Sequence, residues 1–235
     1  MKRWVLFMSM MLIFIGCSEN EENQELDVTD NKENTEQTEE AKALPETLSI
    51  PVMTKENSVT IHLENAPLLG HYLSTAKDDV NEIGQTFRAQ LLTEETDDAL
   101  YMMSYACQGE ESICSYLLVE KGKEEESVIP LTDLASFVSY QLSPDQEKIM
   151  LYFERVINGK KKHHIQVVDL YEHKILSLNN EDLTEQVLDY NYSIESMEWV
   201  DTNKIKIRVP SSIHFDEKKK NTDNLGDDFI LFEVS

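Results

Sequence analysis

Lysines are the most evident candidate binding groups of this chain, because they cluster in a strongly acidic background. The 235 residues hold 45 acidic and 21 basic side chains, for a formal charge of −24. Two lysine triplets interrupt this background. Such clusters can attract an acidic protein or an anionic polymer, or can simply keep an exposed hairpin tip soluble. The candidate partner-binding residues are Lys160, Lys161, Lys162, Lys218, Lys219 and Lys220.

The two triplets differ in their surroundings. The pair Asn158-Gly159 stands directly before the first triplet, and this pair is typical of a type I′ turn, which places the lysines at a hairpin tip. The second triplet is flanked by acids that make its window net negative, which weakens the case for a basic site there. These acids are Asp216, Glu217, Asp223, Asp227 and Asp228.

The spacing of Cys107 and Cys114 favours a disulfide across a hairpin. Cys107 follows an apolar run at 100–105, and Cys114 precedes another at 115–119. In an oxidising compartment two such cysteines are well placed to bridge. In the chain-entropy model, closing so short a loop stabilises the fold by roughly 2 to 2.5 kcal/mol. Two free thiols are the alternative.

Histidines and catalytic motifs give no reason to expect an enzyme. Adjacent strand residues point to opposite faces, so His163 and His164 are not expected to share one metal ion. Residues 223–228 offer oxygen atoms for Ca²⁺ but lack the ordered spacing of a calcium loop. We find no nucleophile elbow, metalloprotease helix, phosphate-binding loop or dinucleotide fingerprint. The sequence therefore predicts no enzymatic activity, no cofactor and no metal. The remaining histidines, which show no ligand spacing, are His62, His71, His173 and His214.

The first residues have the pattern of an export signal. A basic pair precedes an apolar run at 4–15, which is shorter than the roughly 20 residues of a membrane-spanning helix. The run ends on Phe14-Ile15-Gly16-Cys17, which resembles the lipobox of bacterial lipoproteins, although that family prefers Leu at the position of Phe14. The resemblance implies cleavage after residue 16 and acylation of Cys17, with palmitate among the acyl groups. It also implies anchoring at the extracytoplasmic face of the bacterial cell membrane. An uncleaved anchor or a plain secreted protein is the alternative.

A composition change divides the rest of the chain. Residues 18–46 hold eleven acids, two lysines and few apolar side chains. Such a stretch cannot bury enough apolar surface to offset its ordering entropy, and this predicts a disordered acidic tether. We therefore expect a lipoprotein signal peptide at 1–16, the lipidated cysteine and tether at 17–46, and a β-rich domain at 47–235.

The folded part shows the apolar period of strands and little of helices. Its apolar runs are short, rich in β-branched and aromatic residues, and separated by turn-forming residues. Two weaker helical patterns lie at 76–83 and 182–188. The candidate strands are 58–63, 100–105, 115–119, 149–153, 165–169, 205–209 and 229–232.

The candidate strands recur at an offset of roughly 50 residues. One copy contains 100–105, 114–119 and 128–131, the next contains 149–153, 165–169 and 174–178, and a third runs from 197 to 234. The second copy resembles the blade repeat of TolB-type β-propellers, in which a Ser-Pro-Asp-Gly turn leads into an apolar strand. Here the turn reads Ser143-Pro144-Asp145-Gln146. The resemblance implies an all-β fold, and three or four units favour an irregular or partial propeller-like array of antiparallel sheets over a closed ring.

These resemblances imply a protein-interaction module of the cell envelope. Equivalent hairpins of adjacent blades emerge on one side, so we expect the two lysine triplets to lie near each other. The expected partners are the membrane, through the lipid anchor, and an envelope protein or anionic polymer; the acidic charge argues against nucleic acid. The alternatives are a binding protein for an anionic polymer or small ligand, and a cell-wall hydrolase with two carboxylates facing each other across a cleft.

Overall fold

The structure is a computed structural model that describes residues 43–53, 56–94, 98–109, 113–122, 125–180, 188–210 and 229–235. The chain divides into two units, Met1–Glu40 and Ala41–Ser235, and every described residue belongs to the second. The predicted lipidation site Cys17, the second lysine triplet at 218–220 and nearly all of the predicted helix at 182–188 lie outside the described residues.

The described chain begins with a small sheet and helices. Strands β1 (Thr47–Pro51) and β2 (Ser58–His62) pair antiparallel and are followed by η1 (Leu63–Asn65), α1 (Pro67–Thr75) and α2 (Val80–Gly84). Pro67 opens α1, where its missing N–H costs nothing. The Asp79 carboxylate accepts a hydrogen bond from the Asn81 amide at 2.8 Å and caps α2.

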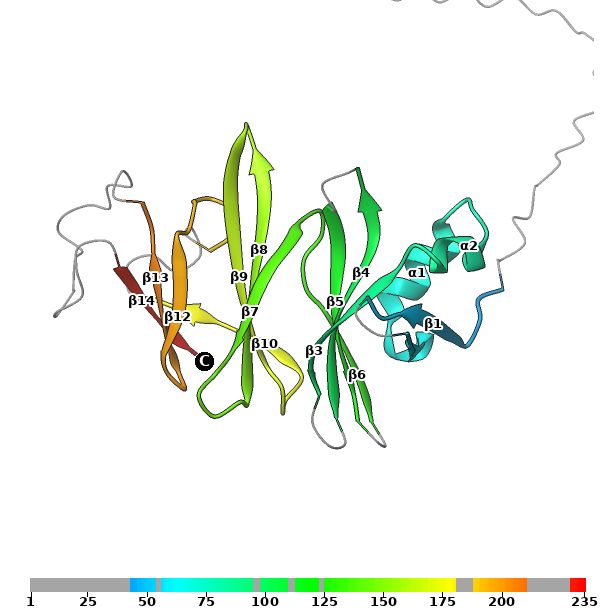
Figure 1. The fold of residues 1–235 in the computed structure, drawn as a ribbon, viewed down its shortest axis with the longest axis horizontal. Helices are drawn as coiled ribbons and strands as arrows, with labels where there is room; N and C mark the ends of the chain where they lie inside the picture. Colours follow the sequence, from blue (N-terminus) through cyan, green and yellow to red (C-terminus); the bar gives the residue numbers. More distant parts are fainter. Residues whose placement is uncertain are drawn as a thin grey trace, which may run out of the picture. The chain divides into compact units, whose positions relative to one another are not determined.

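Three four-stranded antiparallel sheets follow, in the strand orders β3-β4-β5-β6, β7-β8-β9-β10 and β11-β14-β13-β12 (Figure 1). The prediction of a mainly β domain built of antiparallel sheets is therefore confirmed. The strands are β3 (Arg88–Glu94), β4 (Ala99–Gln108), β5 (Ile113–Lys121), β6 (Glu126–Pro130), β7 (Ser136–Leu142), β8 (Lys148–Ile157), β9 (Lys160–Asp169), β10 (Lys174–Leu176), β11 (Leu178–Asn179), β12 (Ser196–Asp201), β13 (Lys204–Arg208) and β14 (Phe229–Val234).

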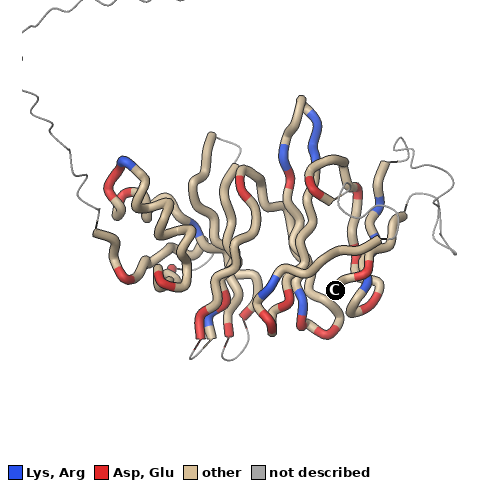
Figure 2. Tube along the Cα trace, turned by 180° about the vertical axis from the view of Figure 1, so that it is seen from behind, with Lys and Arg blue, Asp and Glu red and all other residues tan. Residues whose placement is uncertain are grey.

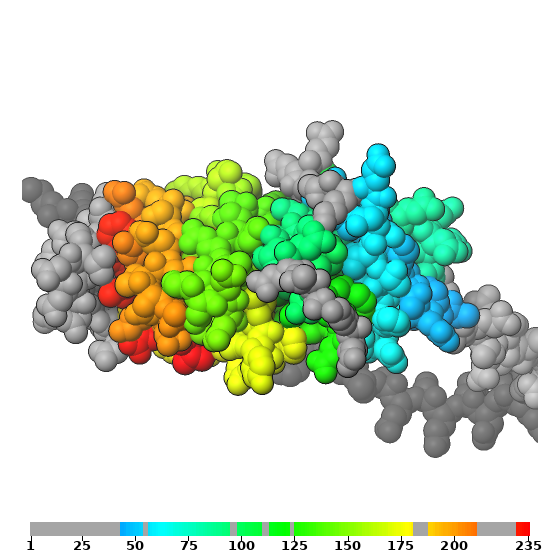
Figure 3. Space-filling model, turned by 60° about the horizontal axis from the view of Figure 1, so that its bottom comes forward, coloured from blue at the N-terminus to red at the C-terminus, as the bar shows by residue number. Residues whose placement is uncertain are grey.

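The sheets pack face to face in the order of the chain, and the colour bands of the space-filling view follow that order (Figure 3). On β8, the odd-numbered Ile149, Leu151 and Phe153 pack in a core shared with β4 and β5. The even-numbered Met150 packs in a second core, with residues of β13 and β14. Because both faces of β8 are covered, its sequence reads as a continuous apolar run instead of an alternating one.

The repeats of the sequence correspond to sheets. The runs at 100–105 and 149–153 lie in β4 and β8, the equivalent second strands of two neighbouring sheets. The run at 174–178 is divided: β10 completes the second sheet, whereas β11 pairs with β14 and completes the third. Among the described residues the sheets form an open row and no closed ring (Figure 1).

The helices and the first strand differ from the prediction. A helix was expected at 76–83, but α1 ends at Thr75 and only α2, which begins at Val80, falls in that range. The sequence Ser58–His62 forms the predicted strand, and its partner β1 had no counterpart in the sequence analysis. Strand β1 is short and contains a proline, Pro51, so propensity gives it little signal.

Side chains hold the turn Ser143-Pro144-Asp145-Gln146 in a conformation that glycine would adopt most easily at its last position. Gln146 has a φ of 63°, in the left-handed region that glycine adopts most easily. The Gln146 amide donates to the Ser143 carbonyl at 2.9 Å. The Ser143 hydroxyl and the Glu147 amide both donate to the Asp145 carboxylate, so side chains hold the turn closed.

Candidate interaction site at the tip of the β8–β9 hairpin

The β8–β9 hairpin carries the first lysine triplet to its tip. Its ladder is regular from Lys148↔Asp169 to Ile157↔Lys160. Asn158 and Gly159 connect the strands with φ values of 54° and 71°, as the predicted type I′ turn requires. Because β7 pairs with β8 only as far as Glu154, the last residues of β8 extend beyond their neighbour.

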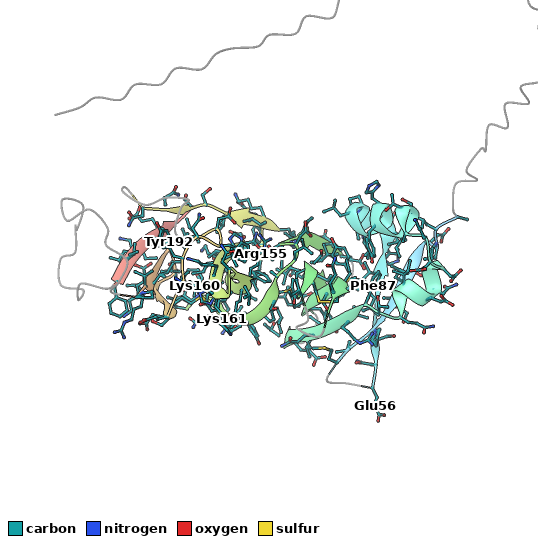
Figure 4. The ribbon with its side chains drawn as sticks, turned by 90° about the horizontal axis from the view of Figure 1, so that it is seen from above. Glu56, Phe87, Arg155, Lys160, Lys161 and Tyr192 are labelled. Atoms are coloured by element: carbon teal, nitrogen blue, oxygen red, sulfur yellow. A yellow bond between two sulfur atoms is a disulfide. The ribbon has the colours of Figure 1, made fainter. Side chains whose placement is uncertain are left out.

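The tip is a local positive site on a negative molecule. Residues 155–162 hold four basic side chains and no acidic one. Figure 2 shows blue segments along this hairpin, whereas red segments dominate the turns at the opposite end of the sheets. Figure 4 looks onto this end and shows Arg155, Lys160, Lys161 and Tyr192 close together over the second and third sheets, away from Phe87.

The lysines of the triplet have different surroundings. The Lys161 ammonium lies 3.0 Å from a Glu154 carboxylate oxygen, yet the Lys161 side chain is 69% exposed. The Lys162 ammonium donates to the Asn191 carbonyl at 2.7 Å and lies 5.6 Å from the centre of the Tyr192 ring. Lys160 has no partner among the residues that the structure describes. Lys160 and Lys161 therefore carry most of the solvent-accessible positive charge of the triplet.

Arg155 adds a fourth charge that the sequence analysis did not select. Its guanidinium lies 3.8 Å from the centre of the Tyr190 ring, and its Nε donates to the Leu134 carbonyl at 3.1 Å. In the described part of the chain no carboxylate pairs with Arg155. The type I′ turn alone could have identified it, since counting back from Asn158-Gly159 pairs Arg155 with Lys162.

Exposed apolar side chains adjoin these charges. Val156 is 52% exposed and Ile157 is 40% exposed, at the end of β8. Leu134 and Val138, on the segment next to β8, are exposed to a similar degree. A surface that combines cations with accessible apolar groups suits a protein partner, which can bury both. We call the side chains of Arg155, Val156, Ile157, Lys160, Lys161 and Lys162 the β8–β9 tip.

Two histidines fix the base of this tip, on opposite faces of β9 as the sequence predicts. The His163 Nδ1 accepts a hydrogen bond from the Ile194 amide at 2.7 Å, so its proton sits on Nε2, which lies 3.3 Å from a Glu154 oxygen. The His164 Nδ1 lies 2.7 Å from the Leu188 carbonyl and must carry a proton there. The adjacent imidazoles thus adopt opposite tautomers.

Burial favours the neutral form of both imidazoles. It lowers the pKa of His163 despite the opposing attraction of Glu154, and it lowers the pKa of His164. The His163 ring lies tilted against Tyr152 with the ring centres 4.8 Å apart, and His164 stacks on Tyr190 with the ring centres 5.0 Å apart. Burial and the nearby Glu154 carboxylate also raise the pKa of Tyr152. Hydrogen bonds join both histidines to the segment 188–194. The same segment contacts Arg155 through the Tyr190 ring and Lys162 through the Asn191 carbonyl.

The predicted disulfide is present at the equivalent hairpin of the preceding sheet. Cys107 on β4 and Cys114 on β5 are bonded, with their Cα atoms 4.0 Å apart. The second lysine triplet lies outside the described residues, so the predicted proximity of the two triplets stays a prediction.

Within the described ranges, no group of three or more His, Cys, Asp or Glu side chains is arranged to hold a metal ion. None of the helices in those ranges has the length and hydropathy needed to span a bilayer. No protein-family model, curated protein or solved structure matches this chain.

Proposed function

We propose that this chain is an extracytoplasmic lipoprotein whose propeller-like array of sheets presents the β8–β9 tip to an acidic surface of another envelope protein. The observation that carries the proposal is the tip itself, with four cations and two exposed aliphatic side chains on a regular hairpin of an acidic molecule. Because the regular β8–β9 ladder already orders the backbone that carries these side chains, binding a partner costs little further conformational entropy.

Three further features support the cellular setting. The lipobox-like ending at Cys17 supports lipid anchoring, and two signals or chains are needed for stable anchoring. The bond between Cys107 and Cys114 suits an oxidising compartment outside the cytoplasm. The stacking of four-stranded sheets, with a Ser-Pro-Asp turn at Ser143, supports a partial propeller-like architecture.

Capture of envelope proteins by charge-matched variants tests the tip. The triple variant K160Q/K161Q/K162Q should lose at least tenfold in capture of its partner after mild crosslinking in the native envelope, and the wild-type capture should weaken with salt. The matched control K77Q/K174Q/K204Q removes three exposed lysines from other surfaces and should capture normally. Equal capture by both triple variants would reject the proposal.

An anionic polymer is the second candidate partner for the same lysines. A probe polymer that contains no protein distinguishes it from a protein partner. Linear polyphosphate binds lysine clusters without apolar contacts. If V156S/I157S reduces protein capture but leaves polyphosphate binding unchanged, the protein partner is favoured. If the variant changes neither while K160Q/K161Q/K162Q abolishes both, the polymer reading replaces it.

Acylation is tested separately. The variant C17S should shift the protein from the membrane fraction to the soluble fraction and abolish incorporation of a labelled fatty acid. A protein that stays in the membrane fraction and remains labelled after C17S would contradict lipidation at Cys17.

A further inference from the structure

Hydrogen bonds to His163 attach much of the segment 188–194 to β9. The Tyr190 amide donates to the His163 carbonyl at 2.9 Å, and the His163 amide donates to the Tyr192 carbonyl at 3.0 Å. The Ile194 amide donates to the His163 Nδ1 at 2.7 Å, and this bond is buried. The end of the segment is therefore attached through an imidazole nitrogen, which can gain a proton.

The bond from Ile194 exists only while His163 is neutral. An imidazolium carries protons on both ring nitrogens, so it cannot accept a hydrogen bond however the ring turns. A protonated Nδ1 would face the Ile194 N–H, and a buried amide without an acceptor is costly. His164 differs, because its Nδ1 lies 2.7 Å from the Leu188 carbonyl and donates to it, so a second proton leaves that bond in place. Protonation therefore opposes attachment at the Ile194 end alone.

The Glu154 carboxylate couples the His163 ring to the lysine triplet. One of its oxygens lies 3.3 Å from the His163 Nε2, and the other lies 3.0 Å from the Lys161 ammonium. A charged imidazole would compete with Lys161 for this carboxylate.

The surroundings of His163 set the pH range of the change. Burial lowers its pKa most, Glu154 opposes this, and the two nearby lysines lower the pKa further, so the ring gains its proton below the ordinary value of about 6.5. Tyr152 stays protonated there, because its own pKa is raised. The titratable or charged neighbours of His163 are Tyr152 and Glu154 on β8, Lys161 and Lys162 on β9, and Tyr192 on the segment 188–194.

The segment 188–194 also holds Lys162 in place. Its Asn191 carbonyl accepts the hydrogen bond from the Lys162 ammonium, and its Tyr192 ring lies beside the same ammonium. Tyr190 has a φ of 54°, a left-handed conformation that is unfavourable for a residue other than glycine. The bound form of the segment is therefore strained and depends on its contacts with β9. Loss of the contacts at residues 191–194 would release Lys162.

We propose that protonation of His163 detaches residues 191–194 from β9 and frees Lys161 and Lys162, so that the β8–β9 tip binds an acidic protein surface more tightly in acid. This inference rests on the proposed function of the tip and adds its regulation. All the changes act in one direction, because the imidazolium adds a positive charge below the tip and both lysines lose their internal partners. Each change favours a partner that carries carboxylates.

Amide hydrogen exchange of the full chain tests the detachment without a partner. Between pH 7.5 and 5.5, the protection factors of the His163 and Ile194 amides should fall about tenfold or more. The amide of Val168, which pairs with Ile149 on β8, should keep its protection. In H163N an amide oxygen can stand near the position of Nδ1 and does not titrate, so protection should not change with pH. Unchanged protection in the wild type, or an equal fall in H163N, would overturn the proposal.

A second variant tests the same step with the imidazole in place. E154Q removes the carboxylate that favours the charged ring, so the loss of protection at Ile194 should require a lower pH than in the wild type. A transition at the same or a higher pH would contradict the role of His163.

Binding of poly-L-aspartate, an acidic polypeptide, tests the consequence for the tip. Between pH 7.5 and 5.5, the affinity of the wild type should rise at least threefold more than that of H163N, and H71Q should follow the wild type. An equal rise in the wild type and H163N, with K160Q/K161Q/K162Q still binding weakly, would overturn the regulation and leave the proposed function standing. If K160Q/K161Q/K162Q binds poly-L-aspartate as tightly as the wild type, the proposed function falls and the regulation falls with it.

Discussion

The β4–β5 and β8–β9 hairpins occupy equivalent positions in neighbouring sheets but are held in different ways. The β4–β5 ladder shifts register between Tyr105 and Gln108, and a disulfide closes its end. The β8–β9 ladder stays regular to its turn, and noncovalent contacts of His163 and His164 fix it. The β4–β5 hairpin is closed by a disulfide, whereas the β8–β9 hairpin carries four cations. The shared architecture thus constrains the base of each hairpin and leaves the tip free to specialise.

The largest expected effect concerns the core that both hairpins share. Phe153 is fully buried and lies 5.4 Å from Tyr116 on β5, measured between ring centres. F153A should lower the free energy of unfolding by ~3–5 kcal/mol through lost transfer energy and a cavity. Denaturant unfolding measures this loss. The control V138A, at an exposed position, should change the free energy of unfolding by no more than about 0.5 kcal/mol. A loss below about 1 kcal/mol would show that the two sheets do not depend on a common core.

Removing the disulfide should destabilise the β4–β5 hairpin and leave the β8–β9 hairpin unchanged. C107S/C114S should lower the free energy of unfolding by about 2 kcal/mol, because the short loop is no longer closed in the unfolded chain. Hydrogen exchange should accelerate around Tyr105 and Ser115 and stay unchanged around Glu154. The reduced wild type should behave like the variant, and acceleration spread equally over both hairpins would contradict independent tips.

Acid should affect the β8–β9 hairpin through His163. Its pKa is lowered in the folded state, so between that value and the unfolded value of about 6.5 the unfolded chain binds more protons. Stability should therefore fall as the pH drops below about 6.5. H163Q should reduce this slope between pH 7.5 and 5.5, whereas H71Q, at an exposed histidine, should retain it. An unchanged slope in H163Q would contradict a neutral buried His163.

The smallest expected effect lies at the opposite end of the second sheet. Q146G should stabilise the protein by about 0.5–1 kcal/mol, because glycine adopts a φ of 63° without the steric penalty of a side chain. Thermal unfolding measures the gain, and partner capture at the β8–β9 tip should not change. Destabilisation would show that Gln146 contributes contacts that outweigh its strain.

Sequence reasoning predicted the parts of this fold that local chemistry determines. The run at 149–153, the Asn158-Gly159 turn and the disulfide spacing each depend on neighbouring residues, and all three were found as expected. The position of β11 beside β14 depends on pairing over 50 residues of chain, for which a local pattern carries no signal.

The candidate site was predicted only in part, for a related reason. Lys160, Lys161 and Lys162 stand out by type, but Arg155 and Tyr190 become neighbours only when the segment 188–194 packs on β9. The helix pattern at 76–83 failed because the cap at Asp79 divides it.

Photocrosslinking from the two tips tests the central claim most directly. A photoreactive residue placed at Lys160 in one variant and at Gln108 in the other reports what approaches the β8–β9 and β4–β5 tips in the native envelope. The account predicts one dominant protein adduct from position 160 that salt suppresses, and little from position 108. Adducts of equal yield from both positions, or from position 108 alone, would contradict it.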